Sequence, residues 1–139
     1  MHVPRAAKVV IFDAQGSVLL LRRSSTHPHH ALRSDLPGGI IENDESWEDG
    51  LCREVKEEAG LVVRPDTLRL VYELNHEYFG KQISRRIFAV HLPHVRPNVQ
   101  ISWEHDKASW VPLDDLKGLE EPYQKGIDYA NAHNLWVEF

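Results

Sequence analysis

Three acidic side chains are spaced so that they can act together. Glu54, Glu57 and Glu58 follow one another at i, i+3 and i+4, which places them on one face of a helix. Like charges at this spacing destabilise an isolated helix by about 0.2–0.5 kcal/mol per pair. Carboxylate oxygens are also the ligands that hard cations such as Mg²⁺ prefer. The spacing therefore indicates either a site for a divalent cation or a solvated acidic helix face.

The segment around these glutamates carries the signals of a helix over Trp47–Ala59. Ser46 and Asp49 resemble a capping box at its start, and Gly60 is suited to a left-handed stop at its end. Gly50 costs about 1 kcal/mol relative to alanine inside a helix, which close packing against a neighbour would explain. The face opposite the carboxylates is apolar at four-residue steps, at Trp47, Leu51 and Val55.

The negative charge of the chain is concentrated in this segment. The formal net charge is −5, yet residues 42–58 hold eight acidic and two basic side chains, so the rest of the chain is about +1. Such a patch repels an anionic substrate unless cations fill it first. The distribution favours a metal-bridged phosphate compound and argues against a nucleic-acid-binding groove.

The composition fits one domain over residues 1–139, large enough for a single core. The single cysteine, Cys52, excludes an internal disulfide and is expected to be buried as a small apolar residue. The first residues contain no apolar run that is long enough for a signal peptide or a membrane span. We therefore expect a cytoplasmic location and no membrane association.

The rest of the chain alternates strand patterns with turns. Apolar or alternating runs predict strands at residues 7–12, 18–22, 68–75 and 82–92, with a short strand within 102–111. Residues 24–35 lack periodicity and are expected to form a loop. Apolar residues at helical spacing predict a C-terminal helix after Pro122: Tyr123, Ile127, Ala130 and Asn134. Strands on both sides of a central helix suggest a mixed sheet between helical layers, an α/β fold.

Residues 39–61 fit a longer pattern, G-x5-E-x7-R-E-U-x-E-E-x-G-U with U an aliphatic residue, at all nine specified positions. This segment resembles the signature of the Nudix hydrolases, which cleave a nucleoside diphosphate linked to another group. The resemblance implies an α/β/α sandwich with a mixed central sheet and a small-molecule nucleotide substrate, and homodimers occur among relatives. A nucleotide-binding module without catalysis, with a regulatory role, is the alternative. An isomerase of prenyl diphosphates on a related scaffold would need a cysteine facing a glutamate across a deep pocket, which Cys52 does not suit.

The resemblance also assigns roles to residues of the motif. It implies that Mg²⁺ or Mn²⁺ is bound by the carboxylates of Glu54, Glu57 and Glu58, with the backbone carbonyl of Gly39 as a further ligand. Arg53 matches the arginine that orients a catalytic glutamate, and Glu45 matches the upstream acid near the metal ions. The general base that activates water is left among three residues: Glu104, Glu54 and His105.

Four arginines and one tyrosine bear on the choice of substrate. Arg22 and Arg23 end a strand and point to opposite faces, so that one of them can meet a phosphate or a base, and Arg85 and Arg86 pose the same choice on a later strand. Tyr78, 17 residues after the motif, resembles a mark of Nudix enzymes that act on dinucleoside polyphosphates. The chain departs from the family at Ile40, where a lysine is frequent, which leaves open how the terminal phosphate is held.

Overall fold

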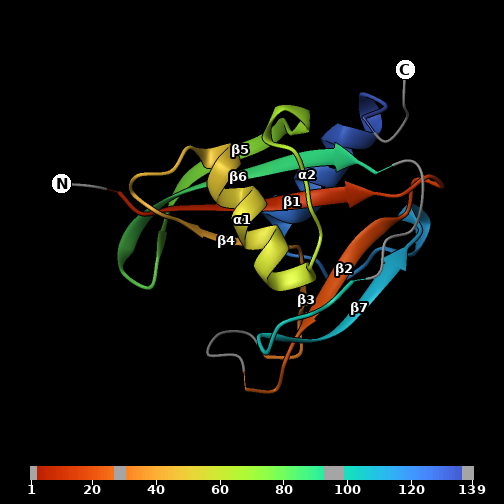
Figure 1. Cartoon of the computed structure of the whole chain (residues 1–139), viewed down its shortest axis with the longest axis horizontal. Helices are drawn as coiled ribbons and strands as arrows, with labels where there is room; N and C mark the ends of the chain where they lie inside the picture. The colour runs from red at the N-terminus through yellow and green to blue at the C-terminus, as the bar shows by residue number, and fades with distance from the viewer. Residues whose placement is uncertain (1–2, 27–30, 93–98, 136–139) are drawn as a thin grey trace.

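A seven-stranded mixed sheet forms the centre of the computed structural model (Figure 1). The structure describes residues 3–26, 31–92 and 99–135, all with their side chains except Tyr78. The strands run in the order β3-β2-β1-β6-β5, while β4 pairs with β1 and β7 pairs with β2. Their bounds are β1 Arg5–Phe12, β2 Val18–Arg23, β3 Ser34–Asp35, β4 Gly38–Ile41, β5 Arg69–Tyr78, β6 Lys81–His91 and β7 His105–Val111. Two α-helices, α1 (Trp47–Ala59) and α2 (Glu121–Ala132), complete the fold with short 3₁₀ turns at Pro65–Thr67 and Leu113–Asp115.

Two strands pair with different parts of one edge of the central strand β1. Along its other edge β1 pairs in parallel with β6 over its whole length. On the first edge, β4 pairs with residues 5–8 of β1, and β2 pairs with its last residue, Phe12. The strands β2 and β4 therefore leave β1 at different points, and the side chains of Lys8 and of Asp35 on β3 lie between them.

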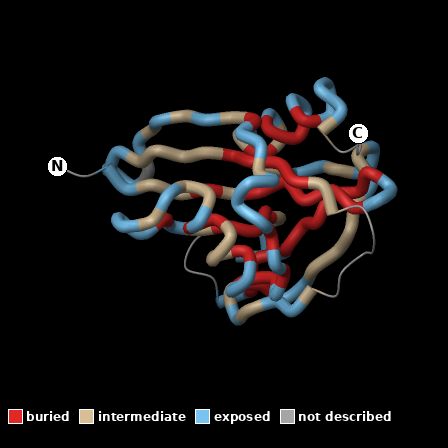
Figure 2. The backbone as a smooth tube through the Cα atoms, turned by 45° about the horizontal axis from the view of Figure 1, so that its top comes forward, coloured by how far each residue is buried: buried red, intermediate tan, exposed pale blue. Residues whose placement is uncertain are grey.

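Both faces of the sheet are covered, each by one helix. Alternate residues of β1 belong to two separate cores: Val9 and Ile11 pack with α1, while Val10 and Phe12 pack with α2. In Figure 1, α1 crosses the near face of the sheet and α2 lies behind it. The buried backbone in Figure 2 follows the centre of the sheet and the inner sides of the helices. This is the α/β/α sandwich that the sequence predicted. Among the described residues, none of the helices is both long and apolar enough to cross a membrane.

Helix α1 has the bounds and caps that its sequence predicted. The Ser46 hydroxyl oxygen accepts a hydrogen bond from the backbone N–H of Asp49 (3.0 Å), and Gly60 ends the helix with φ 69°. Leu51 and Val55 are buried in the core. A Cβ atom at Gly50 would lie 2.8 Å from Cδ1 of Ile41, so the glycine allows β4 to pack closely on the helix.

Two expectations from the sequence were wrong in detail. Residues 34–35, which were expected in a loop, form strand β3, because they pair with Leu21 and Arg22 of β2. A two-residue strand is too short to show periodicity. The C-terminal helix ends at Ala132, so Asn134, with φ 55°, lies beyond it.

Candidate active site

Arg53 organises the carboxylates of α1. Its guanidinium donates two hydrogen bonds to the Glu45 carboxylate (2.8 and 3.0 Å), one to Glu54 (3.0 Å) and one to Glu57 (3.2 Å). It also donates to the backbone carbonyl of Ile40 on β4 (3.1 Å). The hydrogen bonds from Arg53 lower the pKa of Glu45, and those to Glu45 raise the pKa of Arg53 well above its ordinary value. Arg53 therefore carries its charge at any pH of interest and fixes three acids at once.

Two glycines at the start of β4, Gly38 and Gly39, lie against the acidic face of α1. Gly38 donates its backbone N–H to Glu58 (3.2 Å). A Cβ at position 38 would collide with the backbone carbonyl oxygen of Ala7, and one at position 39 would lie 2.6 Å from Oε2 of Glu54. The two glycines thus let β4 approach β1 on one side and the carboxylates on the other.

Two of these carboxylates are shielded from water, Glu58 almost completely and Glu54 in part (18% exposed). Glu58 is only 4% exposed, and burial raises its pKa to about 8. Burial also raises the pKa of Glu54, against the opposing effect of its hydrogen bond with Arg53. Buried acids with raised pKa values are typical of functional sites, where a cation or a proton supplies the missing charge.

The donor set suits a hard divalent cation, since it offers carboxylate oxygens and the backbone carbonyl of Gly39. Within the described residues, however, no group of three or more His, Cys, Asp and Glu side chains lies close enough to hold a metal ion. The reason is visible in the partners: Glu57 turns outward to Arg53, whereas Glu58 turns inward to Gly38. The metal-binding role of Glu54, Glu57 and Glu58 therefore stays a prediction. A cation at the carboxylates of Glu54 and Glu58 would offset the cost of their ionisation.

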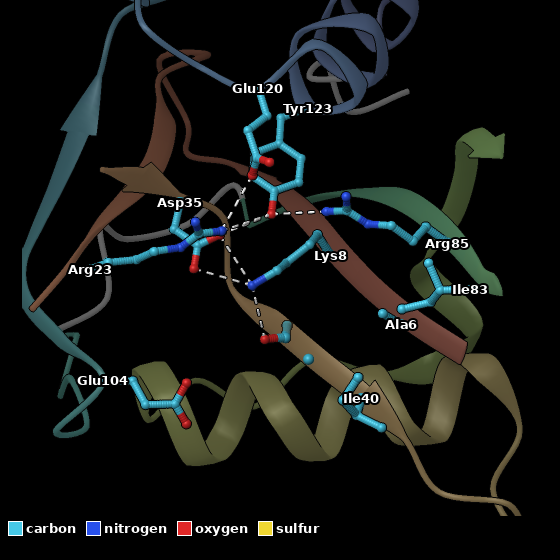
Figure 3. Close-up of a pocket in the computed structure, with 12 residues that line it drawn as sticks. Ala6, Lys8, Arg23, Asp35, Ile40, Ile83, Arg85, Glu104, Glu120 and Tyr123 are labelled. Carbon is cyan, nitrogen blue, oxygen red and sulfur yellow. Dashed lines mark hydrogen bonds and ion pairs between the residues drawn. The ribbon is translucent and has the colours of Figure 1, made fainter. Parts of the chain in front are cut away.

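A cavity of about 240 Å³ begins beside Gly38 and Gly39 (Figure 3). Its walls come from seven parts of the chain: Ala6 and Lys8 of β1, Arg23 of β2, Asp35 of β3, Gly38, Gly39 and Ile40 of β4, Ile83 and Arg85 of β6, Glu104 before β7, and Glu120 with Tyr123 at the start of α2. The backbone carbonyl of Glu104 accepts a hydrogen bond from the N–H of Ser24 (2.9 Å), which ties the segment before β7 to the end of β2. The Glu104 charge contributes to the raised pKa of Glu54. Glu104 therefore lies between the cavity and the acidic face of α1.

Asp35 is the centre of a buried polar network at the inner end of the cavity. Its carboxylate accepts hydrogen bonds from Lys8 (3.2 Å), Arg23 (3.3 Å) and the Tyr123 hydroxyl (3.1 Å), and Nε2 of His105 lies 2.9 Å away. Burial alone would raise the pKa of Asp35, but Lys8, His105 and Arg23 hold it well below its usual range. Figure 3 shows Lys8, Arg23 and Tyr123 converging on this one side chain.

The structure brings most of the predicted site residues together in two groups. The first surrounds Arg53 on α1 and β4: Gly39, Glu45, Arg53, Glu54, Glu57 and Glu58. The second lines the cavity and includes Arg23 and Glu104. Arg22 belongs to neither group, because its half-exposed side chain (48%) pairs with Asp106 at 2.8 Å on the outside of β2. Tyr78 is the last residue of β5, and its side chain lies outside the described part of the structure.

The choices between neighbouring arginines are resolved by the face of the sheet on which each side chain lies. On β6, Arg85 lines the cavity, whereas Arg86 stacks on the Trp47 ring (4.5 Å) and pairs with Glu73. His105, one of the three residues considered as a general base, is buried against Asp35.

Four residues of the cavity were missed from the sequence: Lys8, Asp35, Glu120 and Tyr123. Only Lys8 gave a signal, as a lone charge in an otherwise apolar strand. A charge in a strand that is buried on both faces needs a partner in the interior.

Comparison with known proteins identifies the family of this chain. Residues 2–130 match the family model of the NUDIX domain. A MutT-like protein of Streptomyces ambofaciens is 38% identical over 96% of this chain and 82% of its own length. An ADP-ribose pyrophosphatase of Methanocaldococcus jannaschii is 35% identical over a shorter stretch, 50% of this chain and 40% of that protein. Among solved structures, a MutT protein of Methanosarcina mazei superposes with a TM-score of 0.78 at 28% identity, covering 96% of this chain and 98% of that one. The chain belongs to the Nudix hydrolase family.

Proposed function

We propose that this Nudix hydrolase is a divalent-cation-dependent pyrophosphohydrolase. Its substrate would be a nucleoside diphosphate linked to another group, either a nucleoside triphosphate or a nucleotide derivative. One observation carries the proposal: the backbone of Gly38 and Gly39 borders both the cavity and the carboxylates of Glu54 and Glu58. A nucleotide with its nucleoside in the cavity would present its phosphates to those carboxylates.

The cation in this proposal is Mg²⁺ or Mn²⁺, held by Glu54, Glu57, Glu58 and the carbonyl of Gly39. When bound, it supplies neutralisation of the diphosphate and activation of water. Without a cation, the ionised carboxylates of α1 repel a phosphate. The residues that bind the cation therefore also explain why activity would depend on it.

The side chains of the protein position the reacting groups. Arg53 holds Glu54 and Glu57 through its hydrogen bonds, and the Glu54 carboxylate lies against Gly39 of β4. Water attacks one phosphorus of the diphosphate, the bridging P–O bond breaks, and the other phosphate group leaves. The proton of the water passes to a carboxylate beside the cavity, for which Glu104 and Glu54 are the two candidates. Both lie where the acidic face of α1 meets the cavity.

A pH–rate profile separates the two candidates for the base. If Glu104 accepts the proton, Glu104→Gln removes the acidic limb of the profile and lowers the rate by about 10²–10⁴-fold. A profile that overlays that of the parent enzyme assigns the role to Glu54.

A substrate panel tests the proposed function as a whole. Nucleoside triphosphates, nucleotide sugars, ADP-ribose and dinucleoside polyphosphates are incubated with the protein and Mg²⁺, and the phosphate-bearing products are measured. We expect hydrolysis of at least one class, its loss on chelation of the cation, and its return on addition of Mn²⁺. ADP-ribose belongs in the panel because the relative from Methanocaldococcus jannaschii is named for its hydrolysis. Nucleotide binding without hydrolysis of any compound would instead favour the regulatory module without catalysis.

A further inference from the structure

Lys8 is the one charged residue in the central part of β1, and it faces the cavity. The alternation of the strand places Ala6, Lys8 and Val10 on the same side of the sheet, where Val10 packs with α2 and the other two line the cavity. The Lys8 side chain is only 14% exposed. The sequence therefore places an ammonium group on the floor of the cavity, where the α2-side core would otherwise continue.

Lys8 keeps one hydrogen-bond donor available. Its ammonium donates to Asp35 (3.2 Å) and to the backbone carbonyl of Gly38 (3.2 Å), and these are its two hydrogen bonds among the described residues. A lysine ammonium has three N–H groups. Burial lowers the pKa of Lys8, but the Asp35 carboxylate more than reverses this effect, so the group stays charged. A charged donor in a cavity is strong when a ligand displaces the water around it.

The balance of charges in the cavity indicates what kind of group fits there. Three cationic side chains, Lys8, Arg23 and Arg85, face three acidic ones, Asp35, Glu104 and Glu120. The formal charges cancel, so the cavity has no net attraction for phosphate. The apolar side chains of Ala6, Ile40 and Ile83 offer surface for a flat ring. A neutral ring with polar edges, such as a nucleobase, matches both properties.

We propose that Lys8 is a specificity-determining residue that donates its third N–H to a carbonyl oxygen or ring nitrogen of the substrate's nucleobase. Asp35 acts as the positioning residue that holds the ammonium in place. The inference rests on the proposed function, since it assumes a nucleotide substrate whose phosphates lie at α1. Figure 3 shows the Lys8 ammonium at the centre of the cavity, between Asp35 and the β4 backbone.

Binding of products tests the inference without catalysis. Dissociation constants are measured by calorimetry for AMP, GMP, CMP and UMP, with ribose 5-phosphate as a ligand that has the phosphate but no base. Three variants are compared with the parent. Lys8→Met removes every N–H, whereas Lys8→Gln keeps two amide N–H groups on a neutral side chain that is one atom shorter. Lys125→Met removes an exposed lysine of α2 that pairs with Glu121 and serves as the matched control.

The expected result is a loss confined to the base. The parent should bind at least one nucleoside monophosphate more tightly than ribose 5-phosphate. Both Lys8 variants should weaken that nucleotide by about 10- to 100-fold, the range for one hydrogen bond to a charged group, and leave ribose 5-phosphate unchanged. Lys125→Met should bind every ligand as the parent does. A folding defect of Lys8→Met leaves the test intact, because Lys8→Gln keeps a polar N–H group at this position.

Three outcomes would overturn the inference. Equal weakening of ribose 5-phosphate would assign Lys8 to the phosphate, and unchanged binding in both variants would assign it to the fold alone. A parent that binds nucleotides no better than ribose 5-phosphate would exclude base recognition. Failure of the proposed function would give a different result. The parent protein would then bind nucleotides but hydrolyse no compound of the substrate panel.

Discussion

The networks around Arg53 and around Asp35 are each built on one charged side chain with several opposite partners, but they differ in sequence range and in exposure. The carboxylate partners of Arg53 lie one, four and eight residues away. The partners of Asp35 lie 12, 27, 70 and 88 residues away. The Arg53 side chain is 31% exposed, whereas that of Asp35 is 2% exposed. The first network is a feature of one helix and its neighbouring strand, and the second exists only when five elements have assembled.

This difference suggests that the Arg53 network serves catalysis and the Asp35 network serves stability. Carboxylates at the edge of solvent can exchange an arginine for a cation or a substrate group at small cost, because water screens the change. A buried carboxylate with cationic partners cannot lose its charge without leaving those partners unpaired. We therefore expect substitutions around Arg53 to change the rate, and substitutions at Asp35 to change the stability.

The largest effect should follow Asp35→Asn, which leaves Lys8 and Arg23 buried without their common carboxylate. Loss of one partner of a buried ion pair costs about 3–5 kcal/mol, a large part of the stability of a typical domain. Urea unfolding followed by tryptophan fluorescence measures the loss. A loss below about 1 kcal/mol would show that water or a neighbouring acid replaces the carboxylate and would remove the contrast between the two networks.

The next largest effect should be on turnover in Glu57→Gln, which keeps the size of the side chain and removes its charge. We expect a fall of at least about 100-fold in kcat, the size of other electrostatic contributions at active sites. The free energy of unfolding should change by less than about 0.5 kcal/mol, since the pair with Arg53 is exposed. A near-normal rate on the best substrate of the panel would remove Glu57 from the metal-binding set.

The same contrast explains what could be predicted from the sequence. Helix α1 followed from local rules: its caps, its apolar stripe and its acidic face are all set by residues within one turn or two of each other. The packing reason for Gly50 also followed, because a glycine inside a helix lowers its stability unless a neighbouring element has to come close. The motif on this helix identified the family before any long-range contact was known.

The Asp35 network could not be predicted, because its partners are brought together by strand pairing. Asp35 reaches the cavity through β3, a strand of two residues, and Tyr123 arrives from the other end of the chain. Alternation in β2 indicated that Arg22 and Arg23 point to opposite faces but not which one is buried. The register shift between them in the pairing with β7 shows why that choice depends on the tertiary structure.

A smaller effect should appear in the acid dependence of stability. The pKa of Asp35 is lower in the folded protein than its ordinary value of 3.8, so the folded state holds fewer protons at that position than the unfolded state. The stabilisation is therefore present above pH 3.8 and is lost as the pH falls below it toward the folded pKa. Between about pH 5 and pH 3, the free energy of unfolding of the parent should fall more steeply than that of Asp35→Asn.

Asp106→Asn is the matched control for this comparison. The hydrogen bond from Arg22 also lowers the pKa of Asp106, but that pair is exposed to solvent and is screened. Its acid dependence should overlay that of the parent. If the free energy of unfolding depended equally weakly on pH in both aspartate variants, burial would not distinguish the two carboxylates.

The smallest effect should come from Arg22→Met, compared with Arg23→Met at the neighbouring position. Arg22 pairs with Asp106 on the outside of the sheet, so its loss should change the free energy of unfolding by less than about 0.5 kcal/mol and leave kcat/KM near that of the parent. Arg23 donates to Asp35 and Glu120 inside the cavity, so its loss removes one of the two cationic partners of the buried Asp35 and should lower both quantities. Steady-state kinetics and urea unfolding are measured for both variants. The two positions are adjacent in the sequence but face opposite sides of the sheet. A larger loss of kcat/KM in Arg22→Met would mean that substrate contacts the outside of β2, and the cavity would then not be the nucleoside site.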